Sequence, residues 1–334
     1  MTLDRTSGQE LVIDRRRVAR HLLTAAGKIL VHRNPQRNLR KVLTLLGMMP
    51  RSASAPLYTE DTEVEAQRCV VRRPLSEGPG PVCLLVTYSP DGRLWPHLVS
   101  YARSLRATGC RVVLIATTER TDLCCEDPGP DVVDAVVVRE NHGLDFAAWT
   151  AVLRLWPWLW ETSALWFAND SVYHSPGLFP AFADYVKAST ADVVAATGSN
   201  QIEPHFQSYF FVLKSGALAR RQTRAFFDSV RALVDKDEVI RSYEVKLESA
   251  LEAAGNRVDV FYAPRNKDNP TMKDWRRLNA AGLPFVKVQL LRDNPSGVDL
   301  KDWRGHLAQY GFEPDEVQLH LGSLGLRAAA LLAF

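Results

Sequence analysis

The 334-residue sequence lacks any long apolar run. No stretch approaches the roughly 18 consecutive apolar residues that a membrane-spanning helix requires, and residues 1–10 lack the apolar core of a secretory signal. Glycine and proline number only 19 each, which excludes collagen-like and low-complexity chains. We therefore expect a globular protein in the cytoplasm, either free or attached to the inner face of the cytoplasmic membrane.

Cysteine is also scarce, and its spacing favours neither a bridge nor a metal site. The five cysteines include no CxxC pair, and two of them are the neighbours Cys124 and Cys125. This pattern is typical of reduced thiols. The chain also lacks a GxGxxG motif, which argues against a dinucleotide-binding dehydrogenase. No internal repeat is present, which argues against a solenoid.

Positive charge is concentrated at the start of the chain. The formal net charge is +3, but residues 1–51 carry +8 and residues 52–334 carry −5. Within this arm, residues 11–32 and 36–48 have the apolar spacing of helices. A basic amphipathic segment can lie on an anionic membrane surface, or it can pack against the main domain or another subunit and solvate its charges. It has no aromatic residues among its basic ones, so we expect no nucleic-acid partner.

Turn-forming residues follow this arm. Residues 51–56 are rich in serine, alanine and proline, and residues 76–81 are rich in glycine and proline. Such composition is typical of a linker. We therefore predict a basic helical extension over residues 1–50, a linker over 51–80 and a main domain over 81–320.

In the main domain, short apolar runs alternate with stretches that have helical spacing. Fully apolar runs such as 112–115 and 136–138 are typical of strands that are buried on both faces. Strands separated by helices predict an α/β fold with a mixed, mainly parallel sheet between helical layers. The expected strands are 82–87, 111–117, 135–139, 165–168, 192–196, 208–213 and 257–262. The expected helices are 94–108, 144–155, 178–187, 218–234 and 239–254.

Ligands of open α/β sheets bind beyond the carboxyl ends of the strands, so the residues there are the first candidates for a site. Thr87 and Tyr88 end the first predicted strand in a polar turn, which any α/β protein needs. After the third strand, Gly143 permits a tight turn, and the helix that follows offers free N–H groups to a phosphate or a sugar hydroxyl. Asp145, in the first turn of that helix, is equally typical of a helix cap.

Carboxylates stand at two further places. The fourth predicted strand stops at Asn169-Asp170-Ser171, where a carboxylate beside other oxygen donors suits Mg²⁺ or Mn²⁺ bound to a diphosphate. The same triplet is an ordinary turn composition. Glu244 and Glu248 are four residues apart and share one face of a predicted helix, which fits either a catalytic carboxylate or a solvated surface.

Several short motifs occur in a definite order between Pro81 and about Tyr310. They are Arg139-x-Asn141-x-Gly143-x-Asp145, Asn169-Asp170-Ser171, residues 203–210, Tyr243-Glu244, Asn269-Pro270-Thr271, residues 282–287 and residues 291–295. In this order they resemble the rhamnan synthesis protein F family, whose members are glycosyltransferases of bacterial cell-surface polysaccharides. The first 75 residues take no part in the resemblance.

The resemblance implies a GT-A type nucleotide-sugar fold. It implies that Glu244 is the base that deprotonates the acceptor hydroxyl. It also implies that Asp170 binds a divalent cation or the diphosphate, with His320 as a further metal candidate. The residues expected to bind the nucleotide or donor sugar are Thr87, Tyr88, Arg139, Asn141, Gly143, Asp145, Asn169, Asp170 and Ser171. Those expected at the junction of donor and acceptor are His205, Gln207, Ser208 and Tyr209, although Tyr209 is equally suited to the core.

The sequence departs from the broader pattern of inverting GT-A transferases in two respects. Asn169-Asp170-Ser171 holds one carboxylate where the metal-binding DxD motif holds two, so the need for Mg²⁺ or Mn²⁺ stays open. Val245 follows Glu244 where a second acidic residue is expected. The family name favours L-rhamnose from a dTDP-linked donor, transferred to a growing polysaccharide or a lipid-linked glycan. Two alternatives are a non-catalytic scaffold of a polysaccharide-assembly complex and a sugar nucleotidyltransferase, although residues 87–92 lack the glycine-rich phosphate loop of the latter.

Overall fold

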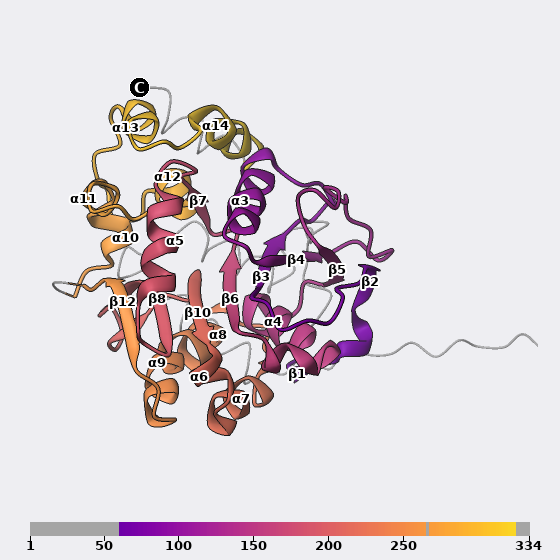
Figure 1. The fold of residues 1–334 in the computed structure, drawn as a ribbon. Coiled ribbons are helices and arrows are strands. Elements are labelled where there is room, and N and C mark those ends of the chain that lie inside the picture. The colour runs from indigo at the N-terminus through magenta and orange to yellow at the C-terminus, as the bar shows by residue number, and fades with distance from the viewer. Residues whose placement is uncertain (1–59, 265–266, 325–334) are drawn as a thin grey trace, which may run out of the picture. The chain divides into compact units, whose positions relative to one another are not determined.

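The computed structural model describes residues 60–264 and 267–324 (Figure 1). The predicted basic extension over residues 1–50 lies outside these residues. No helix in the described ranges is both long enough and apolar enough to span a bilayer.

The centre of the described chain is a mixed sheet of nine strands. The strands are β2 (Val70–Arg73), β3 (Val82–Tyr88), β4 (Arg111–Thr118), β5 (Ala135–Glu140), β6 (Ala164–Asn169), β8 (Val193–Ser199), β9 (His205–Phe206), β10 (Phe210–Lys214) and β12 (Val258–Tyr262). Their order is β12-β8-β10-β6-β3-β4-β5-β2, and β9 pairs with β8. Strands β3, β4, β5, β6, β8 and β12 point one way, whereas β10 runs antiparallel to β6 and β8, and β2 runs antiparallel to β5. The predicted α/β fold with a mixed, mainly parallel sheet is confirmed.

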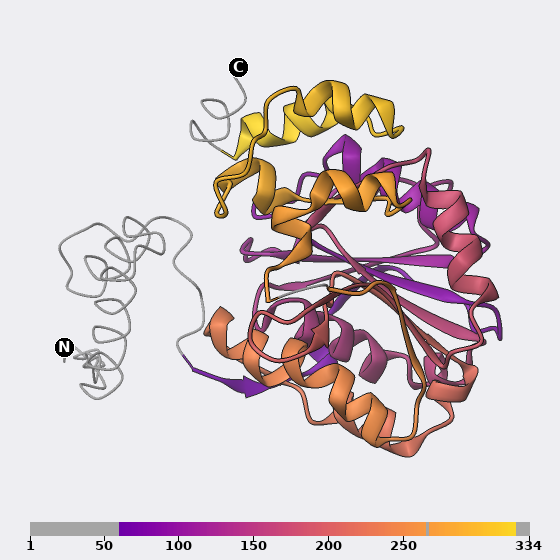
Figure 2. The same ribbon diagram turned by 90° about the vertical axis from the view of Figure 1, so that its left-hand side faces the viewer.

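Helices cover both faces of this sheet, which Figure 2 shows nearly edge-on. On one face lie α3 (Pro96–Ala107) and α5 (Phe179–Ala188). On the other face lie α4 (Leu144–Leu155), α6 (Ser215–Leu218), α7 (Arg221–Asp228) and α9 (Val245–Ala253). The central strands are apolar throughout because both faces are buried: Leu84 packs with the α4 layer and Leu85 with the α3 layer. The Nε1–H of Trp149 donates to the carbonyl of Leu84 at 3.1 Å, which anchors α4 to the middle of β3.

The C-terminal part of the described chain forms a third apolar cluster, in a region where the sequence pattern predicts no elements. It contains α10 (Pro270–Lys273), α11 (Trp275–Ala280), α12 (Val288–Asp293), α13 (Trp303–Gln309) and α14 (Pro314–Ser323). A short antiparallel pair, β7 (Val172–His174) with β13 (Phe285–Lys287), joins this cluster to the loop after β6. This pairing brings Lys287 opposite Val172, directly beside Ser171.

Three predicted segments differ from the structure. Part of the predicted linker belongs to the domain, because β1 (Thr62–Glu63), a 3-10 turn, η1 (Ala66–Arg68), and β2 all precede Pro81, and β2 extends the sheet next to β5. The predicted helix 218–234 is broken, because β11 (Arg231–Ala232) pairs with β1. The predicted helix 239–254 is instead α8 (Lys236–Val239), a π-helical turn, η3 (Ile240–Glu244), and α9. A further 3-10 turn, η2 (Pro157–Glu161), follows α4.

Candidate active site

Asp170 follows β6 directly, and the neighbouring strand β3 holds its carboxylate. The Oδ2 atom of Asp170 accepts hydrogen bonds from Thr87 Oγ1 and from the Tyr88 backbone N–H, both at 2.7 Å. Val86 lies opposite Asn169 in the parallel pair of β3 and β6, so the carboxyl ends of these strands meet. Burial raises the pKa of Asp170, and the two hydrogen bonds oppose this rise. Thr87 and Tyr88 therefore orient Asp170 at the edge of the sheet.

Asn169 links Asp145 to Ser171. Its Nδ2 donates to Asp145 Oδ2 at 2.7 Å, and its Oδ1 accepts from Ser171 Oγ at 2.6 Å and from the Ser171 backbone N–H at 3.1 Å. Burial, together with the nearby charge of Asp170, raises the pKa of Asp145 to about 6. Two neighbouring carboxylates that both resist ionisation form an arrangement that a bound cation stabilises.

Gly143 places the start of α4. It is the N-cap residue of that helix, with a φ of +79°. A Cβ on Gly143 would lie 2.6 Å from Ala232 Cα and 2.5 Å from Ala147 Cβ. The close approach of β11 and the left-handed backbone thus account for this glycine. The predicted tight turn is confirmed, and its effect is to bring Asp145 within reach of Asn169.

Among the described residues, no side-chain hydrogen bond or ion pair joins Arg139 or Asn141, which the sequence predicts to bind the donor, to Asp145 or Asp170. The side chain of Arg139 is buried and lines a small pocket with Arg68 and His142. Burial lowers the pKa of Arg139 to about 10, and its Nη1 has no hydrogen-bond partner within the described chain. The backbone N–H of Asn141 donates to the carbonyl of Thr118 at 2.9 Å, at the end of β4.

Glu244 ends the π-helical turn η3 and meets two predicted partners. Its Oε2 accepts a hydrogen bond from Ser208 Oγ at 2.7 Å, and its Oε1 lies 3.8 Å from His205 Nε2. The Nδ1 of His205 is 2.7 Å from the carbonyl oxygen of Glu203, so this nitrogen carries a proton and donates it. Burial by itself raises the pKa of Glu244, but His205, Lys287 and Ser208 outweigh it and hold that pKa below its usual value. Glu244 is therefore ionised at neutral pH, which is the state that a general base needs.

Gln207 and Tyr209 are buried and share a hydrogen-bond partner, Thr197. Thr197 Oγ1 is 2.9 Å from Gln207 Oε1 and 3.0 Å from Tyr209 Oη. Tyr209 is only 1% exposed and packs in the core beside the α3 layer, as the alternative interpretation predicts. Its ring nevertheless forms part of the site, because the Nζ of Lys287 lies 4.3 Å from the ring centroid.

Lys287 is not among the predicted site residues. It ends β13, and its Nζ donates to Ser171 Oγ at 3.1 Å. Burial lowers the pKa of Lys287 to about 8, and Glu244 and Asp145 oppose this shift. Lys236, an exposed residue at the start of α8, is also absent from the prediction, and its charge lowers the pKa values of Asp145 and Asp170. Two sequence signals point to Lys287: it ends the motif at residues 282–287, and it is a single lysine at the end of an apolar run, 283–286.

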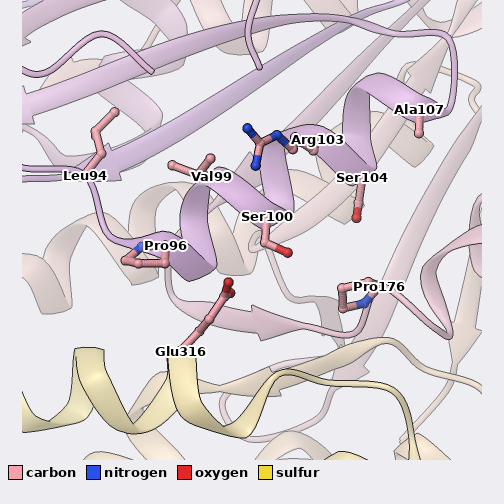
Figure 3. Close-up of a pocket in the computed structure, with 9 residues that line it drawn as sticks. All are labelled: Leu94, Pro96, Val99, Ser100, Arg103, Ser104, Ala107, Pro176 and Glu316. Atoms are coloured by element: carbon pink, nitrogen blue, oxygen red, sulfur yellow. The ribbon is translucent and has the colours of Figure 1, made fainter. Parts of the chain in front are cut away.

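His320 lies on α14 and contacts other residues. Its Nδ1 is 2.8 Å from Tyr173 Oη, and its ring centroid is 4.3 Å from that of His97. A groove of about 610 Å³ runs between α3 and α14, with Arg103 and Glu316 on opposite sides (Figure 3). None of the predicted site residues lines this groove. In the part of the chain that the structure describes, no contact connects His320 with Asp170.

The donor set at the sheet edge fits a particular kind of metal site. Across residues 60–264 and 267–324, no three histidine, cysteine or carboxylate side chains are grouped as a metal site built from the protein alone requires. The pair of Asp145 and Asp170 fits an ion that uses two carboxylates and completes its coordination with water and phosphate oxygens, as Mg²⁺ does.

The rhamnan synthesis protein F family model matches residues 118–294, which is just over half of the chain. The chain belongs to this family. The matched segment contains Asp145, Asp170, Glu244 and Lys287. "Virulence protein VirA" of Vibrio anguillarum is 27% identical in an alignment 213 residues long, and the match covers 53% of this chain and 66% of that protein. "Uncharacterized protein y4gN" of Sinorhizobium fredii is 25% identical in an alignment 207 residues long, and the match covers 58% of this chain and 52% of that protein. The chain thus spans between about half and two thirds of the length of these curated relatives.

Solved structures with a similar arrangement include three transferases. A glycosyltransferase involved in glycosylation of the major capsid of PBCV-1 has 10% identity and a TM-score of 0.34, and the match covers 69% of this chain and 100% of that one. S. aureus TarS in complex with UDP-GlcNAc has 9% identity and a TM-score of 0.31, with coverages of 69% and 71%. The inositol-1-phosphate CTP transferase of T. maritima has 14% identity and a TM-score of 0.33, with coverages of 56% and 87%.

Proposed function

We propose that this protein is a nucleotide-sugar-dependent glycosyltransferase of the GT-A type. The observation that carries the proposal is the placement of two carboxylates near the ammonium of Lys287: Glu244, which is ionised beside His205 and Ser208, and Asp170, which Thr87 orients. Lys287 connects the two, because it donates to Ser171 and its charge lowers the pKa of Glu244. Membership in a family described by the synthesis of rhamnan supports a sugar as the group that is transferred.

In the proposed reaction, Glu244 takes the proton from the acceptor hydroxyl. The acceptor oxygen then forms a bond to the anomeric carbon of the donor sugar, while the bond from that carbon to the diphosphate breaks. The diphosphate leaves with the electron pair of that bond. A positioned general base contributes about 10²- to 10⁴-fold to the rate of such a step. The hydrogen bond from Ser208 orients the Glu244 carboxylate, and the neighbouring His205 stabilises its charge.

A divalent cation, Mg²⁺ or Mn²⁺, is part of this proposal. Asp170 and Asp145 would hold it. Burial and the proximity of the two carboxyl groups disfavour ionisation of both, and a bound cation would compensate their charge. When bound, the cation would supply charge neutralisation for the departing diphosphate. We do not assign His320 to this ion, since its Nδ1 contacts Tyr173.

The donor and acceptor are proposed more narrowly from the family description. A dTDP-linked L-rhamnose is the proposed donor, and a growing cell-surface polysaccharide or a lipid-linked glycan is the proposed acceptor. Contact of the basic extension over residues 1–50 with an anionic membrane surface stays a prediction, because that segment lies outside the described residues.

Calorimetric titration with dTDP, UDP, GDP and CMP tests the proposal, with Mg²⁺, with Mn²⁺ and with chelator. We expect selective binding of one nucleoside diphosphate that weakens in chelator. If the affinity is the same with chelator, the proposed transferase activity stands and the proposed metal is excluded. If the folded protein binds none of these nucleotides, the transferase is refuted and the scaffold of a polysaccharide-assembly complex takes its place.

A further inference from the structure

The site contains a cation that the proposed reaction does not yet use. The ammonium of Lys287 stands between the Asn169-Asp170-Ser171 loop and Glu244. Lys287 ends a short apolar strand, yet the residue is partly exposed rather than sealed in the core. Its position is set by Ser171, which accepts its hydrogen bond at 3.1 Å, and by the face of the Tyr209 ring at 4.3 Å.

This ammonium is incompletely compensated. An ammonium has three N–H donors, and among the described residues only Ser171 accepts from it. No described carboxylate oxygen lies within 4.0 Å of Nζ. Glu244 and Asp145 act on Lys287 only through longer-range charge, and Lys236 opposes them. Two N–H groups thus stay available to a ligand that reaches the site.

The charges around Lys287 indicate what kind of ligand this is. Asp145, Asp170 and Glu244 place three carboxylates around the sheet edge, which repel a diphosphate unless positive charge offsets them; the proposed divalent cation offsets Asp145 and Asp170, and Lys287 acts on Glu244. A positive group beside the Asn169-Asp170-Ser171 loop removes that obstacle at the place where the leaving group is expected. Lys236 is exposed and therefore more strongly screened by solvent than Lys287 is.

We propose that Lys287 binds the diphosphate of the sugar-nucleotide donor and stabilises the negative charge that develops on it during transfer. This inference rests on the proposed function and assigns a side chain to the leaving group. When the bond between the anomeric carbon and the diphosphate oxygen breaks, the electron pair stays on that oxygen. The acceptor proton goes to Glu244, and Lys287 keeps all of its protons. Its contribution is electrostatic, from a donor that is held in place before the reaction.

The test compares Lys287→Met and Lys287→Arg with the wild type and with Lys246→Met. Lys246 is a matched control, because it is a half-exposed lysine that pairs with Glu203 at 2.7 Å on the surface. Affinities are measured for dTDP, UDP and GDP and for the parent nucleosides, with Mg²⁺ and with chelator. We expect Lys287→Met to weaken diphosphate binding about 10- to 100-fold, as for a lost charge-assisted hydrogen bond. Nucleoside affinity should not change, and Lys287→Arg should restore most of the loss.

The outcomes separate this inference from the proposed function. If the wild type binds a diphosphate and Lys287→Met binds it equally well, the role of Lys287 is refuted and the transferase stands. An equal loss for nucleoside and diphosphate also refutes it, since that result indicates a structural effect. A wild type that binds no nucleotide refutes the proposed function itself.

A measurement on the wild type alone covers the case in which Lys287→Met does not fold. Because the pKa of Lys287 is lowered to about 8, diphosphate affinity should fall between pH 7 and pH 9 while nucleoside affinity stays level. Binding of the diphosphate that is independent of pH over this range would overturn the assignment.

Discussion

Gly143 is required for two reasons, its backbone conformation and the lack of space for a Cβ, and substitutions at two glycines can separate them. Its φ of +79° disfavours any residue with a Cβ, and a Cβ at this position would lie 2.6 Å from Ala232 Cα and 2.5 Å from Ala147 Cβ. Gly109 is a matched control, because its φ of +89° imposes the first constraint while nothing lies within 4 Å of the position that its Cβ would take. The difference between Gly143→Ala and Gly109→Ala therefore measures the cost of the overlap with Ala232 of β11 and Ala147 of α4.

The magnitude follows from these two terms. A left-handed residue with a Cβ costs about 1–2 kcal/mol, and this cost applies to both variants. Overpacking adds about 1–3 kcal/mol, and this cost applies only to Gly143→Ala. With an unfolding entropy of about 2.1 cal/mol/K per residue, 1 kcal/mol lowers the melting temperature of a chain of this length by about 1.5 °C. We therefore expect Gly143→Ala to melt about 1–5 °C below Gly109→Ala.

Urea and thermal unfolding of both variants beside the wild type provide the measurement. Because the overlap lies at the start of α4, we also expect Gly143→Ala to displace Asp145 and to weaken nucleotide binding, whereas Gly109→Ala should bind as the wild type does. If the two variants unfold at the same temperature, steric overlap at position 143 does not affect stability and this prediction is wrong.

Three further predictions concern the site and the C-terminal cluster. Glu244→Gln should lower the transfer rate by about 10²- to 10⁴-fold with nucleotide affinity unchanged, and a cellular assay in which the variant retains full function would instead indicate a scaffold. Ser208→Ala removes a hydrogen bond that lowers the pKa of Glu244, so the acid limb of the pH–rate profile should move to higher pH; an unmoved limb would contradict that role. Burial lowers the pKa of His320 to about 4 and that of His174 to about 3. Both lie below the value of about 6.5 for histidine in an unfolded chain. Because the unfolded chain then binds protons more readily than the folded protein, the free energy of unfolding should decrease as the pH falls from about 6.5 towards 4. Melting temperatures from pH 7.5 to pH 4 test this, and His320→Asn should flatten the curve; an equal slope in that variant would exclude His320 as a source.

Local sequence patterns predict the central layers of the fold well. The apolar runs that form β3, β4 and β5 are buried on both faces, and the predicted helix 144–155 has the bounds that the structure shows. Patterns of this kind succeed because burial on both faces leaves a continuous apolar signal. Strand β2 escapes prediction because it is a four-residue edge strand, and its pairing with β5 depends on a distant partner.

The sequence predicts those site residues that lie at the ends of strands. It does not predict those that reach the site through pairing of distant segments. Thr87, Asp145 and Asp170 meet because parallel strands end at one edge, which their place in the sequence indicates. Lys287 is placed beside Ser171 by the short β7–β13 pair, and local sequence patterns do not predict this pairing. Arg139 lies within β5, where strand alternation puts it on the same face as Ala135 and Val137, in the α4 layer, and its role in donor binding stays a prediction.

Strand β10 fixes the spacing between the two parts of the proposed site. Because it runs against its neighbours, the chain enters β10 at the edge where β6 ends, and the carbonyl of Tyr209 accepts a hydrogen bond from the Asn169 backbone N–H at 3.2 Å. Ser208, which contacts the proposed base Glu244, and Asp170, the proposed ligand of the metal or diphosphate, therefore lie on either side of this backbone hydrogen bond between Asn169 and Tyr209. Substitutions in the surrounding helices can lower the stability of the fold. The distance between Ser208 and Asp170 should stay the same as long as β6 and β10 remain paired.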